Sequence, residues 1–372
     1  MAFPKGELTI DLRAVRNNWQ TLKSQLDSGV ECGAVVKANA YGLGVKKIVL
    51  ALYQSGCRNY FVTNLEEAVE IQSLLPADSR IFVLCGCNPG EELEFVHRGL
   101  IPVIISTAMF CRWHNSIRQL KSNTPAFSAV LKINTGMCRL GIDINEFETL
   151  LNDSRQLQVA GISMLMSHFA CAEEANHPLN QKQIDRFSSC MERAKKTLPI
   201  VSGTLSNSSG IFLSKRAHFN LVRPGIAIYG GNPQPEKPNV MAPVVTLGLP
   251  VIQIRDVPAG EAIGYGATNS VSHNRVIAIV AGGYADGILR IMGNKGYGFF
   301  SQRQVPIVGR ISMDSTAFDV SAIPVEQRPK EGDTIALLNQ SSPIDNLAST
   351  VGTISYEILT ALGSRYIRTY IE

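Results

Sequence analysis

The sequence predicts an α/β fold class, namely a (β/α)8 barrel of the TIM type followed by a mainly antiparallel β domain. In the first part of the 372-residue chain, eight short apolar runs alternate with helical patterns, which is typical of parallel strands joined by crossover helices. Eight such units over about 230 residues match the size of a closed barrel better than that of an open sheet. Further along the chain, the apolar runs become short and are separated by glycine and proline, which suits an antiparallel β domain.

The barrel elements follow in order along the chain. Asp11 is expected to cap an amphipathic helix over 12–26, because apolar residues recur there at spacings of three and four. The runs expected to form strands cover residues 32–38, 60–63, 81–86, 100–106, 126–134, 159–168, 200–207 and 221–230. The helical patterns between them include residues 65–75, 107–121 and 181–198.

A turn-rich stretch at 231–235 predicts a linker between two domains. The barrel is therefore expected at residues 11–235 and the β domain at residues 236–372. The short runs expected to form strands of the second domain cover residues 244–256, 275–281, 298–300, 305–312, 316–320 and 334–338. Residues 1–10 contain one more short run that could add a strand to either domain.

Composition narrows the class of protein. The chain is 45% hydrophobic and 18% charged, with 35 Lys and Arg against 31 Asp and Glu, and it contains no basic block. We therefore expect a globular protein without a nucleic-acid partner. Charges among the first twenty residues leave no room for a signal peptide, and no apolar run approaches membrane-spanning length. A cytoplasmic protein without a membrane partner is expected.

The eight cysteines all lie in the first 200 residues without a repeated spacing, and buried free thiols explain them best. The pair in Cys85-Gly86-Cys87 is too close for the usual zinc spacing, and no second pair complements it. We expect no structural metal.

The segment from Val35 to Gly44 carries the first chemical signal. Its lysine, Lys37, ends a buried apolar run, where an ammonium group is costly unless it has a partner or a task. An amine of this kind can condense with an aldehyde, and the tyrosine and glycines that follow suit a bound phosphate. Together they suggest pyridoxal phosphate held as a Schiff base. The alternative is a lysine that reaches water at a strand end, with the glycines forming only a turn.

The barrel prediction allows a test, because catalytic residues of such barrels lie at the carboxyl ends of the strands. The residues expected at that rim are Lys37, Lys132, Arg139, His168, Asn207, Ser208, Arg223, Gly225 and Ile226. Each has a structural explanation when taken alone. Together they supply amines, guanidinium groups, an imidazole and small-residue backbone around one rim.

The same residues carry a family resemblance. The segments VVKANAYGLG, KINTGMCRLG, SHFA, LSNSSG, VRPGIAIYG, AIGYGAT, GGYADGILR, VGRISMD and TISYEIL occur in this order and resemble those of the bacterial alanine racemases. The resemblance covers nearly the whole chain. It implies a barrel with a C-terminal β domain, pyridoxal 5′-phosphate as cofactor, and a homodimer whose active sites combine both subunits. The implied function is interconversion of L-alanine and D-alanine, supplying D-alanine for peptidoglycan.

By resemblance, Lys37 is the Schiff-base lysine and one of two catalytic bases, and Tyr265 of the partner subunit is the other. Inversion of a stereocentre needs such a pair, because a proton leaves one face and another arrives on the opposite face. The resemblance places His168 beside Tyr265 and Arg223, and it places Arg223 against the pyridine nitrogen, which favours racemisation over other pyridoxal chemistry.

The resemblance gives roles to further residues. Arg139 would contact the substrate carboxylate, and Lys132 would be a carbamylated lysine that positions Arg139. The other implied cofactor-binding residues are Tyr41, Asn207, Ser208, Gly225, Ile226 and Tyr356. From the second subunit, Met313 and Asp314 would form the substrate-side loop, and Tyr284, Arg290 and Arg310 would line the access corridor. The sequence departs from many relatives at two positions, with Leu43 in place of histidine and Asn134 in place of aspartate.

Three alternatives stay open at this point. A racemase of another small amino acid such as serine differs only in pocket size, and a methyl against a hydroxymethyl group changes binding by about 1 to 3 kcal/mol. A pyridoxal phosphate carrier protein would share the barrel but lack the second domain with Tyr265. A non-catalytic paralogue usually lacks one base, whereas Lys37 and Tyr265 are both present.

Overall fold

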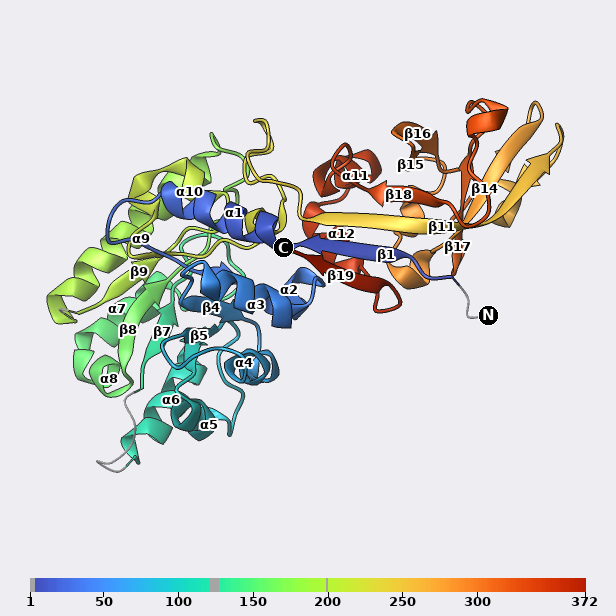
Figure 1. Ribbon diagram of the computed structural model, residues 1–372. Helices are drawn as coiled ribbons and strands as arrows, with labels where there is room; N and C mark the ends of the chain where they lie inside the picture. Colours follow the sequence, from blue (N-terminus) through green and yellow to red (C-terminus); the bar gives the residue numbers. More distant parts are fainter. Residues whose placement is uncertain (1–3, 121–126, 199) are drawn as a thin grey trace.

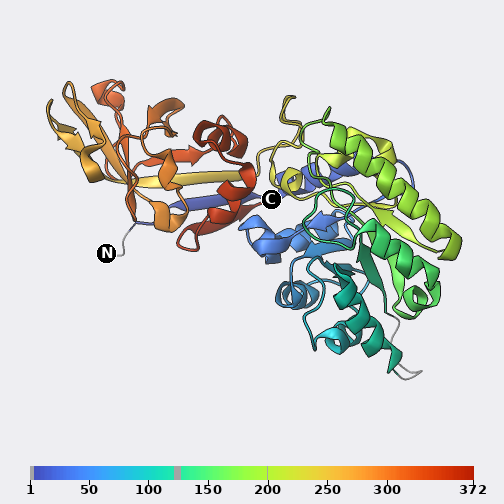
Figure 2. The same cartoon turned by 180° about the vertical axis from the view of Figure 1, so that it is seen from behind.

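The computed structural model describes residues 4–120, 127–198 and 200–372. Figure 1 shows two parts, a barrel surrounded by helices and a sheet domain through which β1 (Glu7–Asp11) and β11 (Val245–Val257) run. Seen from behind in Figure 2, the second domain extends away from one side of the barrel. In the described residues, no helix combines the length and apolar character needed to cross a membrane.

The barrel is built from parallel strands, as the sequence predicts. Seven of them pair in chain order: β3 (Ala34–Val35), β4 (Asn59–Val62), β5 (Arg80–Val83), β6 (Ile101–Ile104), β7 (Ala129–Lys132), β8 (Ile162–Met166) and β9 (Ser202–Thr204). The strands β2 (Glu31–Cys32) and β10 (Leu221–Val222) pair beside β3. The N–H groups of Gly33 and Asn220 donate to Val222 O and Gly203 O, both at 2.9 Å, so β10 joins the two edges and closes the barrel.

Helices cover the outside of these strands. Asp11 caps α1 (Leu12–Ser24) as predicted, since its Oδ1 accepts from Ala14 N at 2.8 Å. The other barrel helices are α3 (Val45–Gln54), α4 (Leu65–Gln72), α5 (Glu92–Arg98), α6 (Thr107–Arg118), α7 (Ile144–Asn152), α8 (Ser154–Val159), α9 (Pro178–Thr197) and α10 (Gly210–Leu213). The short element α2 (Lys37–Tyr41) lies at the rim and is not a regular helix. The start of the predicted run at 126 and the end of the predicted helix at 121 lie outside the described residues.

Several predicted strands are too long, and two of them end early where the backbone changes conformation. The first ends at Val35 rather than at residue 38, because the backbone turns at Lys37. The last ends at Val222 rather than at residue 230, because Pro224 has no N–H for a ladder and residues Ile226–Tyr229 form a 3-10 turn. Both errors occur where the chain leaves the barrel rim and enters the cavity described below.

The second domain is mainly antiparallel, as predicted. Besides β1 and β11 its sheet contains β14 (Arg275–Ala281), β15 (Tyr297–Phe300), β16 (Arg303–Pro306), β17 (Ser315–Asp319), β18 (Thr334–Leu338) and β19 (Ile367–Ile371). The chain also forms a hairpin of β12 (Ala262–Ile263) and β13 (Asn269–Ser270), and two helices that the strand pattern missed, α11 (Ile344–Val351) and α12 (Ser355–Ala361). The predicted strand over 305–312 ends at Pro306, again at a residue without an N–H.

The N-terminal run joins the second domain, a choice that the sequence leaves open. The strand β1 pairs antiparallel with β11 and parallel with β19, so it lies between the first and the last long strands of this domain. The chain then enters the barrel directly through α1. Asn18 of α1 fastens this junction, because its side chain binds Ile228 O and Ala242 O and accepts from Ala242 N. Both domains are therefore connected at more than the linker.

Candidate active site

A cavity of about 650 Å³ opens at the carboxyl ends of the barrel strands. Its size falls in the range of sites for small molecules and cofactors. The predicted residues that line it are Lys37, Tyr41, Lys132, Arg139, His168, Asn207, Ser208, Arg223, Gly225 and Tyr356. Nine of these come from the barrel rim, and Tyr356 comes from α12 of the second domain. Residues distant in the sequence thus meet where the barrel geometry predicts them.

Lys37 stands at the start of an unusual turn. Ala38, Asn39, Ala40 and Tyr41 all have φ between +52° and +55°, which makes this stretch a single left-handed turn. For residues other than glycine, this conformation costs about 1–2 kcal/mol each. One carboxylate and one amide stabilise this turn. Glu67 Oε1 accepts from Ala38 N, and Asn39 Oδ1 accepts from Val45 N, both at 2.7 Å. Strain of this kind concentrates at functional sites.

Arg223 lies at the base of the cavity and is only 4% exposed. Its guanidinium donates to Thr204 Oγ1 at 2.5 Å, to Ser167 O at 2.7 Å and to Leu205 O at 3.3 Å. It also lies 3.2 Å from His168 Nδ1. Because a guanidinium can only donate, Nδ1 accepts this bond and the proton of a neutral His168 lies on Nε2. No carboxylate of the described residues forms an ion pair with Arg223.

Burial and positive charge lower the pKa of two groups in the cavity. Burial, followed by the charges of Arg223 and Lys132, holds the pKa of His168 well below its ordinary value. Burial also lowers the pKa of Lys132 to about 8, with Arg223 and Arg139 as further causes. Lys132 is 7% exposed, so its amine is kept from water beside two guanidinium groups. One carboxylate, that of Glu173, also lines the cavity, but it is exposed and forms no ion pair with these cations among the described residues.

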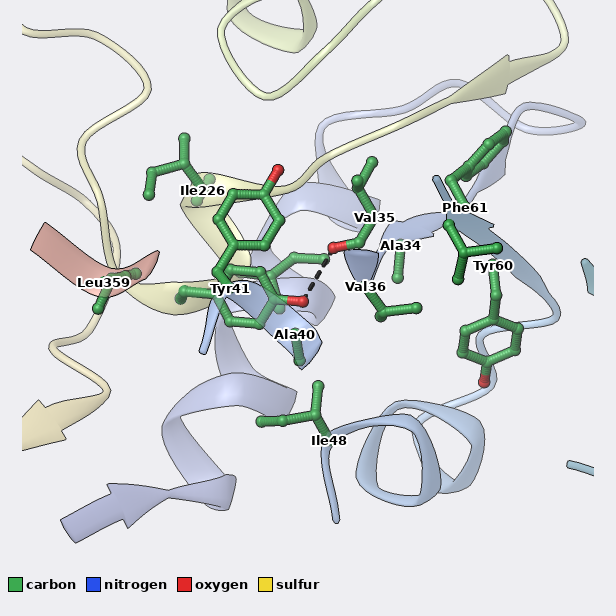
Figure 3. Packing of buried hydrophobic residues seen from close by; sticks show 14 of the residues in the cluster. Ala34, Val35, Val36, Ala40, Tyr41, Ile48, Tyr60, Phe61, Ile226 and Leu359 are labelled. Carbon is green, nitrogen blue, oxygen red and sulfur yellow. Dashed lines mark hydrogen bonds between the residues drawn. The ribbon is translucent and has the colours of Figure 1, made fainter. Parts of the chain in front are cut away.

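A polar corner of the cavity is built from backbone and hydroxyl groups. Ser208 Oγ accepts from Gly225 N at 2.9 Å and from Ala227 N at 3.3 Å, which leaves its own hydroxyl hydrogen able to donate. The ring of Tyr41 lies beside it, and a Cβ at Gly225 would come within 2.3 Å of Tyr41 Oη. Figure 3 shows Tyr41 packed among Ala40, Ile226 and Leu359. This close backbone approach, next to unpaired cations, suits a phosphate group.

Arg139 lies on an exposed loop that ends at the cavity. Asn134 shapes the loop: its Oδ1 accepts from Gly136 N at 3.1 Å and from Cys138 N at 3.0 Å. Its Nδ2 donates to Asp143 Oδ1 at 3.0 Å, which connects the loop to the start of α7. Lys132, at the end of β7, and Arg139, on the loop that follows, thus reach the same cavity.

Of the predicted rim residues, Ile226 is buried and does not line the cavity. The remaining predicted residues lie elsewhere. Tyr265, Tyr284, Arg290, Arg310, Met313 and Asp314 belong to the second domain, and none of them lines the cavity of its own chain. Tyr265 is 70% exposed and Met313 is 53% exposed. Arg310 lies against Gly266, where a Cβ would come within 2.7 Å of its Nη1, and Asp314 binds Arg365 at 2.8 Å. His168 and Tyr265 are therefore not neighbours within one chain.

Two residues of the site were not singled out by the sequence: Glu67, which supports the turn after Lys37, and Cys85, which lines the cavity. Glu67 accepts from Thr63 N as well as from Ala38 N, and its only sequence signal is a capping pattern with Asn64, which Glu67 N does complete. Cys85 lines the cavity and is exposed, as are Cys111 and Cys138, so the expectation of buried thiols fails at these three positions. Cys85 follows β5 at the rim, Cys138 lies in the loop after β7, and Cys111 lies on the helix α6. No metal-ligating group of three or more His, Cys, Asp or Glu occurs in the described residues.

Known proteins with similar sequence and structure share one name. The family descriptions "Alanine racemase, N-terminal domain" and "Alanine racemase, C-terminal domain" match residues 10–233 and 244–370. An alanine racemase of Rhodospirillum rubrum is 44% identical over 363 residues, 98% of this chain and 95% of the relative. A catabolic alanine racemase of Agrobacterium fabrum is 41% identical over 367 residues, 99% of this chain and 92% of the relative. The structure of alanine racemase from Bartonella henselae with covalently bound pyridoxal phosphate superposes with a TM-score of 0.92 at 37% identity, covering 99% of this chain and 100% of that one.

The left-handed turn yields a first prediction. Ala38 is exposed, so Ala38→Gly removes only the unfavourable contact of its Cβ with the backbone at φ +52°. We expect the free energy of unfolding to rise by about 0.5–1 kcal/mol, after the greater flexibility of glycine in the unfolded chain is subtracted. Ala108→Gly, at an exposed position of the right-handed helix α6, is the control and should lower the stability. A loss of stability in both variants by urea unfolding would contradict a strained turn.

Proposed function

Because the chain belongs to the alanine racemase family, a family of pyridoxal-phosphate-dependent amino-acid racemases, we propose that it interconverts L-alanine and D-alanine with Lys37 and Tyr265 as its two bases. One observation carries this proposal: Lys37 lies just after the barrel strand β3, in a cavity whose other cations have no ion-pair partner among the described residues. Such a cavity attracts an anionic cofactor and gives it an amine to react with.

The residues of the cavity fit pyridoxal phosphate. When bound, this cofactor supplies an aldehyde that condenses with amines and a ring that stabilises negative charge on a substrate carbon. Lys37 would hold its aldehyde end. Ser208 and the backbone of Gly225 and Ile226 would hold the phosphate, together with Asn207 and the hydroxyl groups of Tyr41 and Tyr356. Arg223 would face the ring nitrogen, and its bonds to Thr204, Ser167 and Leu205 keep that guanidinium in place.

Tyr265 would act from a second subunit. It is exposed and lies outside the cavity of its own chain, so it can serve as a base only where another copy brings it to Lys37. We propose a homodimer in which Met313 and Asp314 accompany Tyr265 into the partner's cavity. Tyr284, Arg290 and Arg310 would line the corridor leading to it. His168 and Arg223 would lie next to the partner subunit's Tyr265, where their positive environment favours the phenolate.

Arg139 would bind the substrate carboxylate, a task that suits its planar guanidinium. We propose that Lys132 is carbamylated and positions Arg139. The lowered pKa of Lys132 supports this, because a neutral amine can attack carbon dioxide and release a proton, whereas an ammonium cannot. The resulting carbamate is an anion and would relieve the excess of positive charge beside Arg223 and Arg139.

The D-alanine produced would supply peptidoglycan synthesis in the cytoplasm. A catabolic role is the other candidate, since the relative from Agrobacterium fabrum carries that description. Deletion of the gene separates the two: a requirement for D-alanine during growth supports supply, and a defect only on alanine as carbon source supports catabolism. We also propose residues 11–235 and 236–372 as the two domains, with β1 belonging to the second; the family matches at 10–233 and 244–370 support these bounds.

Racemisation itself has a direct test. Purified protein with pyridoxal phosphate, incubated with L-alanine in deuterated water, should yield D-alanine with one α-deuterium, because the incoming proton comes from a base that exchanges with solvent. Chiral separation followed by mass analysis measures both products. Serine offered under the same conditions reports the breadth of the substrate. A protein that binds the cofactor but gives neither D-alanine nor deuterium uptake would refute the proposal.

The composite site predicts complementation between inactive variants. Lys37→Ala and Tyr265→Ala should each be inactive alone, and their mixture should recover up to about a quarter of wild-type activity, since half of the dimers are mixed and each has one intact site. A Lys37→Ala/Tyr265→Ala double variant mixed with Lys37→Ala is the control and should recover nothing. If exchange of subunits is proven and the first mixture stays inactive, each site is contained in one chain.

Carbamylation of Lys132 predicts a linked effect of carbon dioxide and pH. Protein equilibrated with ¹³C-bicarbonate should show a carbamate carbon resonance that a Lys132→Met variant lacks. Without carbon dioxide, the folded amine has a pKa of about 8 against an ordinary value of 10.5. Between these values the unfolded chain binds the proton more tightly, so the stability of the wild type relative to Lys132→Met should rise with pH. Bicarbonate should extend that rise below about pH 8, because formation of the carbamate from the ammonium group and bicarbonate also releases a proton on folding. A bare amine in the presence of bicarbonate would contradict the assignment.

A further inference from the structure

The last strand of the chain contacts the turn that follows Lys37. Tyr370 Oη donates to Leu43 O at 2.9 Å, and Arg368 Nη2 donates to Gly42 O at 3.2 Å. Both side chains belong to β19, at the edge of the sheet of the second domain. Figures 1 and 2 both show this strand next to α2, at the junction between the domains. Two successive carbonyl groups of the turn are thus bound by the other domain.

The contact is close as well as polar. A Cβ at Gly44, which has φ +98°, would lie 1.9 Å from Tyr370 Oη, and a Cβ at Gly42 would lie 2.6 Å from Leu359 O of α12. Glycine is therefore required at both positions for the chain to lie against this surface. The same helix provides Tyr356, whose ring centroid lies 5.8 Å from that of Tyr41. The second domain therefore contacts this segment at several positions between Tyr41 and Gly44.

The internal bonds of the turn do not use these carbonyls. Gly42 N donates to Ala38 O at 2.8 Å, Leu43 N to Ala40 O at 3.1 Å and Gly44 N to Asn39 O at 3.0 Å. Gly42 O and Leu43 O receive their hydrogen bonds from β19. A left-handed turn of alanine, asparagine and tyrosine is unfavourable in isolation, so external bonds of this kind shift its equilibrium toward the ordered form.

Arg368 and Tyr370 are suited to hold one arrangement. Arg368 also donates to Gly363 O at 2.9 Å and to Leu362 O at 3.5 Å, so one guanidinium joins carbonyls of both domains. Its Nε is buried without a partner among the described residues. Burial raises the pKa of Tyr370, so its hydroxyl remains a donor over the ordinary pH range. Neither side chain reaches the cavity.

We propose that Arg368 and Tyr370 are positioning residues for Lys37, which hold the left-handed turn from the second domain and so set the direction of the lysine amine. The inference rests on the proposed role of Lys37 in cofactor binding, but its first consequence concerns the protein without cofactor. The final strand of the chain then links the docking of the second domain to the affinity of the barrel for pyridoxal phosphate. A variant that weakens this contact should loosen the turn before it affects the fold.

The test uses Tyr370→Phe with Tyr366→Phe as a matched control. Tyr366 lies four residues earlier and is 6% exposed, but its hydroxyl has no hydrogen-bond partner among the described residues. In the full-length protein without cofactor, hydrogen–deuterium exchange in the peptide covering 37–44 should rise about fivefold in Tyr370→Phe, as expected for one lost hydrogen bond, and stay unchanged in Tyr366→Phe. Pyridoxal phosphate, titrated by absorbance, should bind about fivefold more weakly to Tyr370→Phe alone.

Arg368→Gln provides the second variant and should act in the same direction, and Arg368→Lys should recover part of the effect. Unchanged exchange of residues 37–44 in both Tyr370→Phe and Arg368→Gln would overturn the proposal. So would a rise spread evenly over the chain, or a looser turn with unaltered cofactor affinity. Failure of the proposed function would appear separately, as absence of α-deuterium in alanine from a wild-type protein whose exchange pattern follows the prediction.

Discussion

Uncompensated positive charge at the barrel rim is the constraint on which the rest of the site depends. Lys37, Lys132, Arg139 and Arg223 line one cavity, and none of them forms an ion pair with a described carboxylate. Burial of such charges is unfavourable unless hydrogen bonds or an anion offset it. Burial lowers the pKa of His168 and of Lys132, and the neighbouring positive charges lower both further. An anionic cofactor and a carbamate would both offset the same excess of positive charge, so the two proposals have one physical basis.

Backbone strain is the second constraint, and it has the same location. The turn after Lys37 is held by Glu67 and Asn39 from the barrel and by Arg368 and Tyr370 from the second domain. Fixing the lysine in advance reduces the entropy lost when an aldehyde reacts with it. The fold thus uses a strand from the opposite end of the chain to maintain a local conformation that the residues of the turn do not favour themselves.

The sequence predicts the parts of this protein that depend on periodicity and on strand ends. The alternation of short apolar runs with helical patterns predicts the eight strands. The rim residues follow from them, because a parallel barrel places the carboxyl ends of all its strands together. Periodicity fails where the backbone departs from regular values: the strand ending at Val35, the left-handed turn and the 3-10 turn at Ile226–Tyr229. The place of β1 depends on contacts hundreds of residues away, with β11 and β19, and no local pattern encodes it. Tyr265 was assigned only through the family resemblance, since nothing in its surroundings within one chain marks it as a base.

Leu43 and Asn134, where the resemblance leads us to expect histidine and aspartate, each make local contacts that suit the residue present. Leu43 has no exposed surface. Its backbone carbonyl, not its side chain, accepts the hydrogen bond from Tyr370, so this contact needs no polar side chain at position 43. Asn134 accepts two backbone N–H groups, as a carboxylate could, but it also donates to Asp143. An aspartate at 134 would bring two carboxylates to 3.0 Å, where like charges repel. The amide at Asn134 and the carboxylate at Asp143 are therefore matched to each other, and the loop that carries Arg139 keeps its shape because both are present.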